Sequence, residues 1–248
     1  MVQKKHHQVS LNIVIPVFNE AADLEKSIRT LVEFLMKNMD DFAWTVTIVD
    51  NASVDDTLDI SRKLSHDYQR VQVIHLLERG RGRAVKYAWE LSNTDMVAYM
   101  DVDLSTDLRH FPSLVRSLSE GYDVAIGSRN AKGARVYGRN ILRTVTSKAY
   151  ILLIKCFFFV HFSDAQCGFK AMTRRMVKVL LPNTIDTEWF FDTELLILAE
   201  KLGYRIYEEP VTWIDNPGST VKVWKTAFGD LCGLWRMFLT RPWRKQYE

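Results

Sequence analysis

Short runs of β-branched and other apolar residues alternate with longer amphipathic stretches from residue 11 to about residue 130. This alternation is typical of strands separated by helices, and it constrains the fold more than any other feature of the chain. Helices between consecutive strands imply an α/β fold, with a mostly parallel sheet and helices on both faces. The expected strands are 11–17, 46–50, 71–77, 96–101 and 124–128, and the expected helices are 23–37, 55–66, 84–91 and 108–120.

Polar residues follow four of the expected strands. They are found at 16–20, at Asp50 and Asn51, at 101–103, and at Ser128 and Arg129. Ligands of a parallel sheet bind at the carboxyl ends of its strands, where these residues should meet. The pattern therefore predicts a binding site along this edge.

The alternation fades beyond residue 130. There the chain has a basic loop, an apolar run at 150–162, a QCGFK segment, an amphipathic helix near 193–202 and a last strand at 205–213. We find no internal repeat, low-complexity tract or Pro- or Gly-rich linker. We therefore expect one domain over residues 1–248, with two functional halves, 11–130 and 131–248.

Composition narrows the class of protein. The 33 Lys and Arg exceed the 30 Asp and Glu by only three charges, which by itself does not indicate a nucleic-acid partner. Three cysteines without CxxC spacing favour neither a disulfide framework nor structural zinc, and they fit a reducing compartment. Residues 1–10 lack the apolar core of a signal peptide, and the 150–162 run is shorter than the roughly 20 residues of a spanning helix. We expect a cytoplasmic protein.

The triplet Asp101-Val102-Asp103 follows the apolar residues 96–100, at the end of an expected strand. Alternate residues at a strand end can both turn toward one ligand in the loop. Mg²⁺ and Mn²⁺ are commonly held by one or two carboxylates together with substrate phosphates, and such a metal neutralises a diphosphate leaving group. A helix N-cap is the alternative role, although residues 105–107 suit it better.

Asp50 ends a very apolar run at 46–49 and is followed by Asn51. A carboxylate in this place accepts hydrogen bonds from a nucleobase or a ribose hydroxyl; the alternative is a turn aspartate. A dinucleotide-binding fold should carry GxGxxG after its first strand, where this chain has Pro16-Val17-Phe18-Asn19-Glu20. A nicotinamide enzyme is therefore disfavoured.

The segment Arg79-Gly80-Arg81-Gly82-Arg83 precedes an expected helix. Two glycines let a backbone come close to a ligand, three guanidiniums supply positive charge, and a helix N-terminus favours an anion. We expect this segment to contact a diphosphate. A solvated basic turn and an RNA-binding RG segment are the alternatives, but RG segments usually lie in disordered tracts.

These motifs resemble those of the family 2 glycosyltransferases. IVIPVFNE, IVDNAS, RGRGRAV, YMDVDLST and IGSR occur in that family's order and spacing over residues 11–129. The resemblance implies the nucleotide-diphospho-sugar transferase (GT-A type) fold, with Asp101 and Asp103 holding the metal and the diphosphate. It implies that Pro16, Phe18, Glu20 and Asp50 line the nucleoside pocket, near Arg81. The expected nucleotide-sugar contacts are Pro16, Val17, Phe18, Asn19, Glu20, Asp50, Asn51, Gly80, Arg81, Gly82, Asp101, Val102, Asp103, Gln166 and Lys222.

The second half resembles the dolichyl-phosphate glucosyltransferase and mannosyltransferase subgroup, and the glucosyl type more closely. DAQCGFK at 164–170 and WFFDTELL at 189–196 match that subgroup's segments. The resemblance implies a polyprenyl or dolichyl phosphate acceptor and UDP-glucose as donor, with GDP-mannose as the nearest alternative donor. One departure is that animal glucosyl-type enzymes carry an N-terminal membrane anchor, which this chain does not show.

A lipid monophosphate acceptor needs cations rather than a strong base, because the second pKa of a phosphate monoester is about 6. Arg129, Arg139 and Arg143 match the subgroup's arginines, and we expect Arg139 and Arg143 to share one helix face, four residues apart. The alternative is a solvated helix face. Lys222 resembles a lysine in a lid-like loop. Attack opposite the diphosphate would invert the anomeric centre and give a β-linked product.

Asp192 and Glu194 are also candidates, because many family 2 enzymes place a catalytic base near this position. Their spacing separates them by about 200° on a helix, so both cannot point into one site unless the helix begins between them. Asp192 is either an N-cap or a sugar ligand, and Glu194 either supports a loop or acts as the base. Both alternatives stay open.

Two segments are candidates for contact with a membrane. The run 150–162 is apolar and flanked by lysines, although a core position explains it equally well. A helical stripe near the C-terminus has basic flanks and combines Trp224, Phe228, Leu231, Trp235, Phe238 and Leu239. Aromatic faces with basic flanks suit an anionic membrane interface, so we expect peripheral contact with the cytoplasmic membrane face.

Three other functions compete with transfer to a lipid phosphate. A family 2 enzyme that glycosylates a saccharide hydroxyl would need Asp192 or Glu194 as its base. The intact Asp101-Val102-Asp103 triplet argues against a non-catalytic nucleotide-sugar binder. An RNA-binding protein would show stacking aromatics or an extended basic stripe, which are absent from the sequence, so no nucleic-acid partner is expected.

Overall fold

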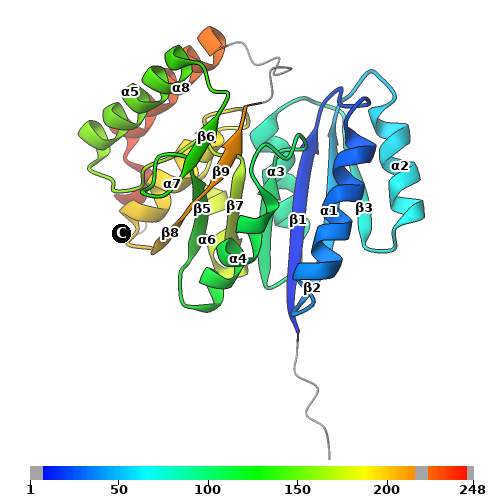
Figure 1. Cartoon of the computed structure of the whole chain (residues 1–248). Coiled ribbons are helices and arrows are strands. Elements are labelled where there is room, and N and C mark those ends of the chain that lie inside the picture. Colours follow the sequence, from blue (N-terminus) through cyan, green and yellow to red (C-terminus); the bar gives the residue numbers. More distant parts are fainter. Residues whose placement is uncertain (1–7, 216–222, 245–248) are drawn as a thin grey trace, which may run out of the picture.

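A seven-stranded sheet forms the centre of the molecule, and a two-stranded sheet lies beside it (Figure 1). The computed structural model describes residues 8–215 and 223–244, with only the backbone of 223–226. The large sheet contains β1 (Val9–Val17), β2 (Phe42–Asn51), β3 (Val71–Leu76), β4 (Met96–Met100), β5 (Val124–Ser128), β7 (Phe169–Thr173) and β8 (Ile206–Pro210). The small sheet pairs β6 (Arg135–Tyr137) with β9 (Thr212–Ile214).

The strand order of the large sheet is β3-β2-β1-β4-β7-β5-β8. All neighbouring strands are parallel except β7, which runs antiparallel between β4 and β5. The expectation of a mostly parallel sheet is therefore confirmed. The strand β7 was not predicted, because it begins at the end of the QCGFK segment, in a region where no alternation of strands and helices marks it.

Helices cover both faces of the large sheet. They are α1 (Leu24–Asn38), α2 (Thr57–Asp67), α3 (Arg81–Leu91), α4 (Phe111–Ser119), α5 (Ile141–Phe158), α6 (Arg174–Leu180), α7 (Phe191–Lys201) and α8 (Val223–Thr240). Short 3-10 helices span Leu108–His110, Leu181–Asn183 and Pro242–Arg244.

Two hydrophobic cores lie on opposite faces of the sheet. On β1, Ile13 and Ile15 join the core formed with α1, α2 and α4, whereas Val14 joins the core formed with α3, α6 and α7. Successive side chains of a strand point to opposite faces, so a strand buried on both sides must be apolar throughout. This explains the unbroken apolar runs of the sequence.

The predicted last strand, 205–213, is wrong as a single strand. It divides into β8, which pairs with β5, and β9, which leaves the large sheet and pairs with β6. Val211 makes the change of sheet: its N–H donates to the carbonyl of Ser128 (3.1 Å), and its own carbonyl accepts from Arg135 N (2.9 Å). As a result Trp213 lies beside the loop that follows β4, where it forms a bridge with Thr106.

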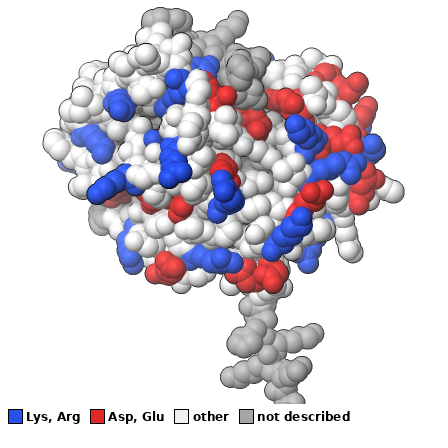
Figure 2. Space-filling model, viewed as in Figure 1, with Lys and Arg blue, Asp and Glu red and all other residues white. Residues whose placement is uncertain are grey.

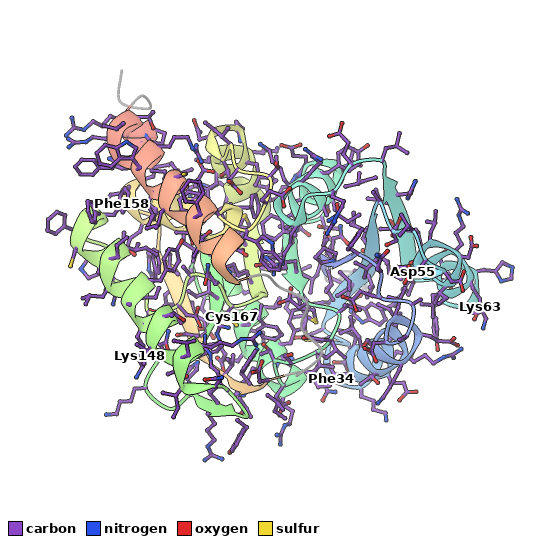
Figure 3. All side chains as sticks on the ribbon, turned by 90° about the horizontal axis from the view of Figure 1, so that it is seen from above. Phe34, Asp55, Lys63, Lys148, Phe158 and Cys167 are labelled. Carbon is purple, nitrogen blue, oxygen red and sulfur yellow. The ribbon has the colours of Figure 1, made fainter. Side chains whose placement is uncertain are left out.

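The helices α5 and α8 lie side by side at the end of the molecule opposite α2 (Figures 1 and 3). The helix α5 begins at Ile141, because Asn140 caps it and accepts a hydrogen bond from Leu142 N (2.9 Å). Arg139 therefore precedes the helix, and the prediction that Arg139 and Arg143 share one helix face is wrong. Among the described residues, no helix is both long and apolar enough to cross a bilayer.

Candidate active site

The loops that follow β1 and β2 lie against each other. The two strands are parallel neighbours, with Val17 opposite Asp50. Pro16 and Val17 still belong to β1, and the loop begins at Phe18. Asn19 connects the two loops: its N–H donates to Ser53 Oγ (3.0 Å), and its side-chain oxygen accepts from the N–H of residue 54 (2.9 Å). Its φ of 55° is one that asparagine tolerates well.

Asp50 is fully buried at the end of β2, so it is not a turn residue. Its Oδ2 lies 2.6 Å from Nδ1 of His75 on β3, and its Oδ1 has no hydrogen-bond partner among the described residues. The adjacent ring of Phe18 is covered by the Arg79 guanidinium, 3.6 Å from the ring centroid. A flat aromatic face and a buried acceptor therefore lie at the ends of two neighbouring strands.

The RGRGR segment does not present three guanidiniums to one anion. Arg79 covers Phe18, Arg83 pairs with Glu78 (2.9 Å), and Arg81 is buried between Asp101 and Asp192.

The two glycines of this segment also serve another purpose than the predicted one. A Cβ at Gly80 would lie 2.7 Å from the carbonyl of Thr187, and one at Gly82 would lie 2.5 Å from Cβ of Phe191. They therefore let α3 pack closely against residues 187–191. Gly80 N also donates to Asn51 Oδ1 (2.9 Å), which holds α3 near the end of β2.

The two carboxylates of the DVD triplet lie at the end of β4. Asp101 Oδ1 accepts from Arg81 (2.6 Å), and its side chain is 45% exposed. Asp103 accepts from the N–H (3.0 Å) and the hydroxyl (2.6 Å) of Ser105, and burial raises the pKa of Asp103. Gly168 packs directly on the carboxylate of Asp101, and its carbonyl accepts from Asp101 N (3.2 Å).

Carboxylates crowd this edge of the sheet in a way that suits a divalent cation. Burial raises the pKa of Glu20 to about 7, and the negative charge of Asp103 and of nearby aspartates adds to the effect. A bound cation would relieve this repulsion, and oxygen ligands suit Mg²⁺ or Mn²⁺. Within residues 8–215 and 223–244, no three His, Cys, Asp or Glu side chains form a complete metal site. Asp101 and Asp103 would therefore share the ion with oxygens of the substrate.

Asp192 lies at the start of α7 and is almost fully buried. Its carboxylate accepts hydrogen bonds from Tyr99 and from Arg81 (2.6 Å), and it lies 3.1 Å from Lys170 Nζ. Burial by itself would raise the pKa of Asp192, but Lys170 and Arg81 hold it below its usual value. The carboxylate is thus an ionised counter-charge for two buried cations, which disfavours a role as general base.

Glu194 points away from Asp192, as the helical spacing predicts, because α7 begins before both residues. Its Oε1 accepts from Arg236 on α8 (2.8 Å), and its Oε2 accepts from the N–H groups of Ile185 (3.1 Å) and Asp186 (2.8 Å). Farther along the same loop, the carbonyls of residues 187 and 188 accept hydrogen bonds from the N–H groups of residue 83 and Gly82. Glu194 therefore supports the loop against which α3 begins.

Two of the three arginines that were predicted to bind the acceptor lie over the ring of Trp213. Arg129 pairs with the buried Asp164 (2.7 Å), and Arg143 pairs with Asp215 (3.0 Å). Arg139 has no hydrogen bond or ion pair among the described residues, and its guanidinium lies over the ring of Trp213, 5.8 Å from the centroid. Arg129 contacts the same ring at 5.5 Å. One indole therefore supports two cations.

Trp213 also joins the two halves of the site. With Asp101, Asp103 and Gly168 it lines a small pocket at the end of β4. Gln166 lies farther toward α8, where its side-chain amide donates to Asp230 (2.8 Å). The expected contact Lys222 is outside the described residues.

Several residues of this site were not predicted from the sequence. Lys170 and Asp164 lie inside a motif that was recognised, yet their burial and ion pairs depend on β7 and on the loop before it. Trp213 was assigned to the end of a predicted strand, and nothing in the sequence marked it as a residue of the site. His75 had no signal at all, since one histidine in an apolar strand shows nothing about its neighbour across the sheet.

The mostly parallel sheet with carboxylates at its carboxyl edge defines a nucleotide-diphospho-sugar transferase fold of the GT-A type. The chain matches the model of Glycosyl transferase family 2 over residues 12–181, and it therefore belongs to this family of glycosyltransferases.

Similar proteins include glycosyltransferase AglD of Haloferax volcanii, which is 35% identical over 238 residues. That match covers 95% of this chain but only 37% of AglD. Dolichyl-phosphate beta-glucosyltransferase of Drosophila melanogaster is 28% identical over 252 residues, 95% of this chain and 77% of that protein.

The fold is also similar to the crystal structure of glucosyl-3-phosphoglycerate synthase of Mycobacterium tuberculosis in complex with Mn²⁺, UDP-glucose and phosphoglyceric acid. The TM-score is 0.68 at 15% identity, over 93% of this chain and 80% of that one.

Proposed function

We propose that this glycosyltransferase moves glucose from UDP-glucose to a polyprenyl or dolichyl phosphate, with inversion and with a divalent metal. The observation that carries the proposal is that two oppositely charged groups meet at Trp213. Asp101 and Asp103 line a pocket together with Trp213, and the guanidiniums of Arg129 and Arg139 lie over its ring. Such a site can bring a metal-bound diphosphate and an anionic acceptor together.

On the donor side, Asp101 and Asp103 would hold Mg²⁺ or Mn²⁺ together with the diphosphate. The metal would neutralise the leaving group as a Lewis acid. Phe18 and Asp50 would bind the nucleoside, since they offer a flat face and a buried acceptor. We assign this half of the site to residues 11–130.

On the acceptor side, residues 131–248 supply most of the binding groups. Arg139 is the candidate for direct contact with a phosphate, because the other two arginines already have carboxylate partners. A phosphate monoester is largely ionised near neutral pH, so the reaction needs no protein base. The engagement of Asp192 and Glu194 in ion pairs agrees with this requirement.

Peripheral contact with the cytoplasmic face of a membrane is part of the proposal. Large apolar side chains are exposed along both α5 and α8: Leu142, Val145, Leu152, Phe159, Phe228, Leu231, Trp235 and Leu239. Of the predicted C-terminal stripe, Phe238 is partly buried, and the side chain of Trp224 lies outside the described residues. Figure 2 shows mainly uncharged and basic side chains around α5, whereas acidic and basic ones are interspersed over α1 and α2. This combination suits an anionic lipid surface.

The test is a radiolabelled transfer assay with polyprenyl phosphate in detergent, with UDP-glucose and GDP-mannose offered separately, and with or without Mn²⁺ or Mg²⁺. Metal-dependent, solvent-extractable product from UDP-glucose is expected. Arg139→Gln should raise the KM for polyprenyl phosphate about tenfold or more and leave the KM for UDP-glucose unchanged. The matched control is Arg135→Gln, because Arg135 is exposed on β6 and has no role in the proposed site. Transfer to a soluble sugar instead of the lipid would refute the acceptor.

A further inference from the structure

One oxygen of a fully buried carboxylate has no partner in this protein. Asp50 has a side-chain exposure of 0%, and its Oδ1 makes no hydrogen bond among the described residues. A buried acceptor without a donor costs free energy, so such groups are rare and call for a cause. A ligand that brings one N–H to this oxygen would satisfy it.

The other oxygen of Asp50 is already taken. Asp50 on β2 and His75 on β3 are partners in the register of two parallel strands, and Nδ1 of His75 lies 2.6 Å from Oδ2. A carboxylate accepts, so Nδ1 carries the hydrogen and donates. The sheet itself sets this pairing, which leaves Oδ1 as the one oxygen of Asp50 without a donor among the described residues.

Neighbouring polar side chains do not supply a second acceptor. The amide oxygen of Asn19 accepts from the N–H of residue 54, and that of Asn51 accepts from Gly80 N. Glu20 belongs to the acidic cluster with Asp101 and Asp103, at the end of the site where the diphosphate would lie.

We propose that His75 determines the nucleobase that the donor pocket accepts. Uracil has one imide N–H on its Watson–Crick edge, which a single free carboxylate oxygen can receive. Guanine has two adjacent donors, N1–H and N2–H, and these match a carboxylate with both oxygens free. Because His75 already donates to one oxygen, the second donor of a bound guanine would have to share that oxygen with Nδ1 of His75, and a poorly paired donor in a buried site weakens binding. The pocket therefore selects uridine nucleotides.

This inference rests on the proposed function and deepens it, since it names the donor class from the geometry of the pocket. The base would take the place of the Arg79 guanidinium on the ring of Phe18, which already holds one flat, delocalised group at stacking distance. His75 acts through Asp50 and is a positioning residue.

Calorimetric titration of the full chain with UDP, GDP and N3-methyl-UDP, at saturating Mn²⁺, tests the inference. The wild-type protein should bind UDP at least about tenfold more tightly than GDP. It should also bind N3-methyl-UDP about tenfold more weakly than UDP. His75→Leu frees the second oxygen and should reduce the UDP preference about tenfold, mainly through tighter binding of GDP. His75→Asn is the matched control: its side-chain nitrogen branches from Cγ like Nδ1 of histidine, so the preference should remain.

Several results would overturn the inference. They are equal binding of UDP and GDP by the wild-type protein, equal binding of UDP and N3-methyl-UDP, or an unchanged preference in His75→Leu. The methylated nucleotide uses wild-type protein, so the test stands even if His75→Leu does not fold. Equal binding of the two bases by an enzyme that still transfers sugar would refute this inference alone. Failure to bind any nucleotide would refute the proposed function as well.

Discussion

Replacing Gly168 with alanine should disable the site without unfolding the protein. Gly168 precedes β7, and a Cβ built there would lie 1.9 Å from Oδ2, 2.3 Å from Cγ and 2.6 Å from Oδ1 of Asp101. Atoms in folded proteins essentially never approach a Cβ within about 3 Å, so the carboxylate must retreat by about 1 Å or more. Asp101 is held by Arg81 at 2.6 Å, and its displacement would disturb that ion pair too.

The size of the effect follows from this displacement. Moving a reacting or binding group by about 1 Å can cost about 100-fold in rate, which equals roughly 2.7 kcal/mol in the activation free energy. The free energy of unfolding should fall by only about 1–2 kcal/mol, because the side chain of Asp101 is 45% exposed and has room to move toward solvent. Activity should therefore fall far more than stability.

Two measurements are made on the variant and on the wild-type protein: the rate of sugar transfer as a function of Mn²⁺ concentration, and the free energy of unfolding in urea. A lower kcat and a higher Mn²⁺ concentration at half-maximal activity are expected. Gly229→Ala is the control, because Gly229 lies in α8 and a Cβ there meets no atom within 4 Å. If Gly168→Ala transferred sugar at the wild-type rate and with the same metal dependence, Asp101 would not be a metal-binding residue.

Three further predictions concern buried acids. Asp192→Asn should lower the free energy of unfolding by about 3–5 kcal/mol in urea, because Lys170 and Arg81 lose their shared counter-charge; unchanged stability with abolished activity would indicate a base instead. Glu194→Gln keeps an acceptor for the supported loop, so kcat should stay within about tenfold, whereas loss of a true base would cost about 10²–10⁴-fold. Burial raises the pKa of Asp230 to about 7 from 3.8, so its ionisation opposes folding, and the free energy of unfolding should fall as pH rises from about 4 to about 7. Asp230→Asn should flatten this dependence in denaturation curves; an identical curve would contradict the assignment.

Much of the donor half could be predicted from the sequence because its signals are local. Strands buried on both faces must be apolar along their whole length, and the polar residues that end them must lie on one edge of a parallel sheet. Asp50 and Asp101 are predicted in this way, and the structure places Asp50 near the end of β2 and Asp101 directly after β4. The expected separation of Asp192 and Glu194 follows from helical geometry alone, and the structure agrees with it.

The errors concern residues whose role depends on partners far along the chain. The guanidiniums of the RGRGR segment do not face one anion, because Arg81 is held by Asp192, about a hundred residues away. Arg139 lies outside α5 because Asn140 caps the helix, which a count of four residues does not reveal.

The sequence by itself determined the alternation of strands and helices, the edge of the sheet at which polar residues gather and the family of the enzyme, because all three depend on patterns within short segments. Only the tertiary structure decided that β7 runs antiparallel between β4 and β5, that Trp213 supports two arginines, and that His75 occupies one oxygen of Asp50. These features arise from strand register and packing between distant segments. Periodicity says which face of a strand is buried, but not which neighbour will lie beside it.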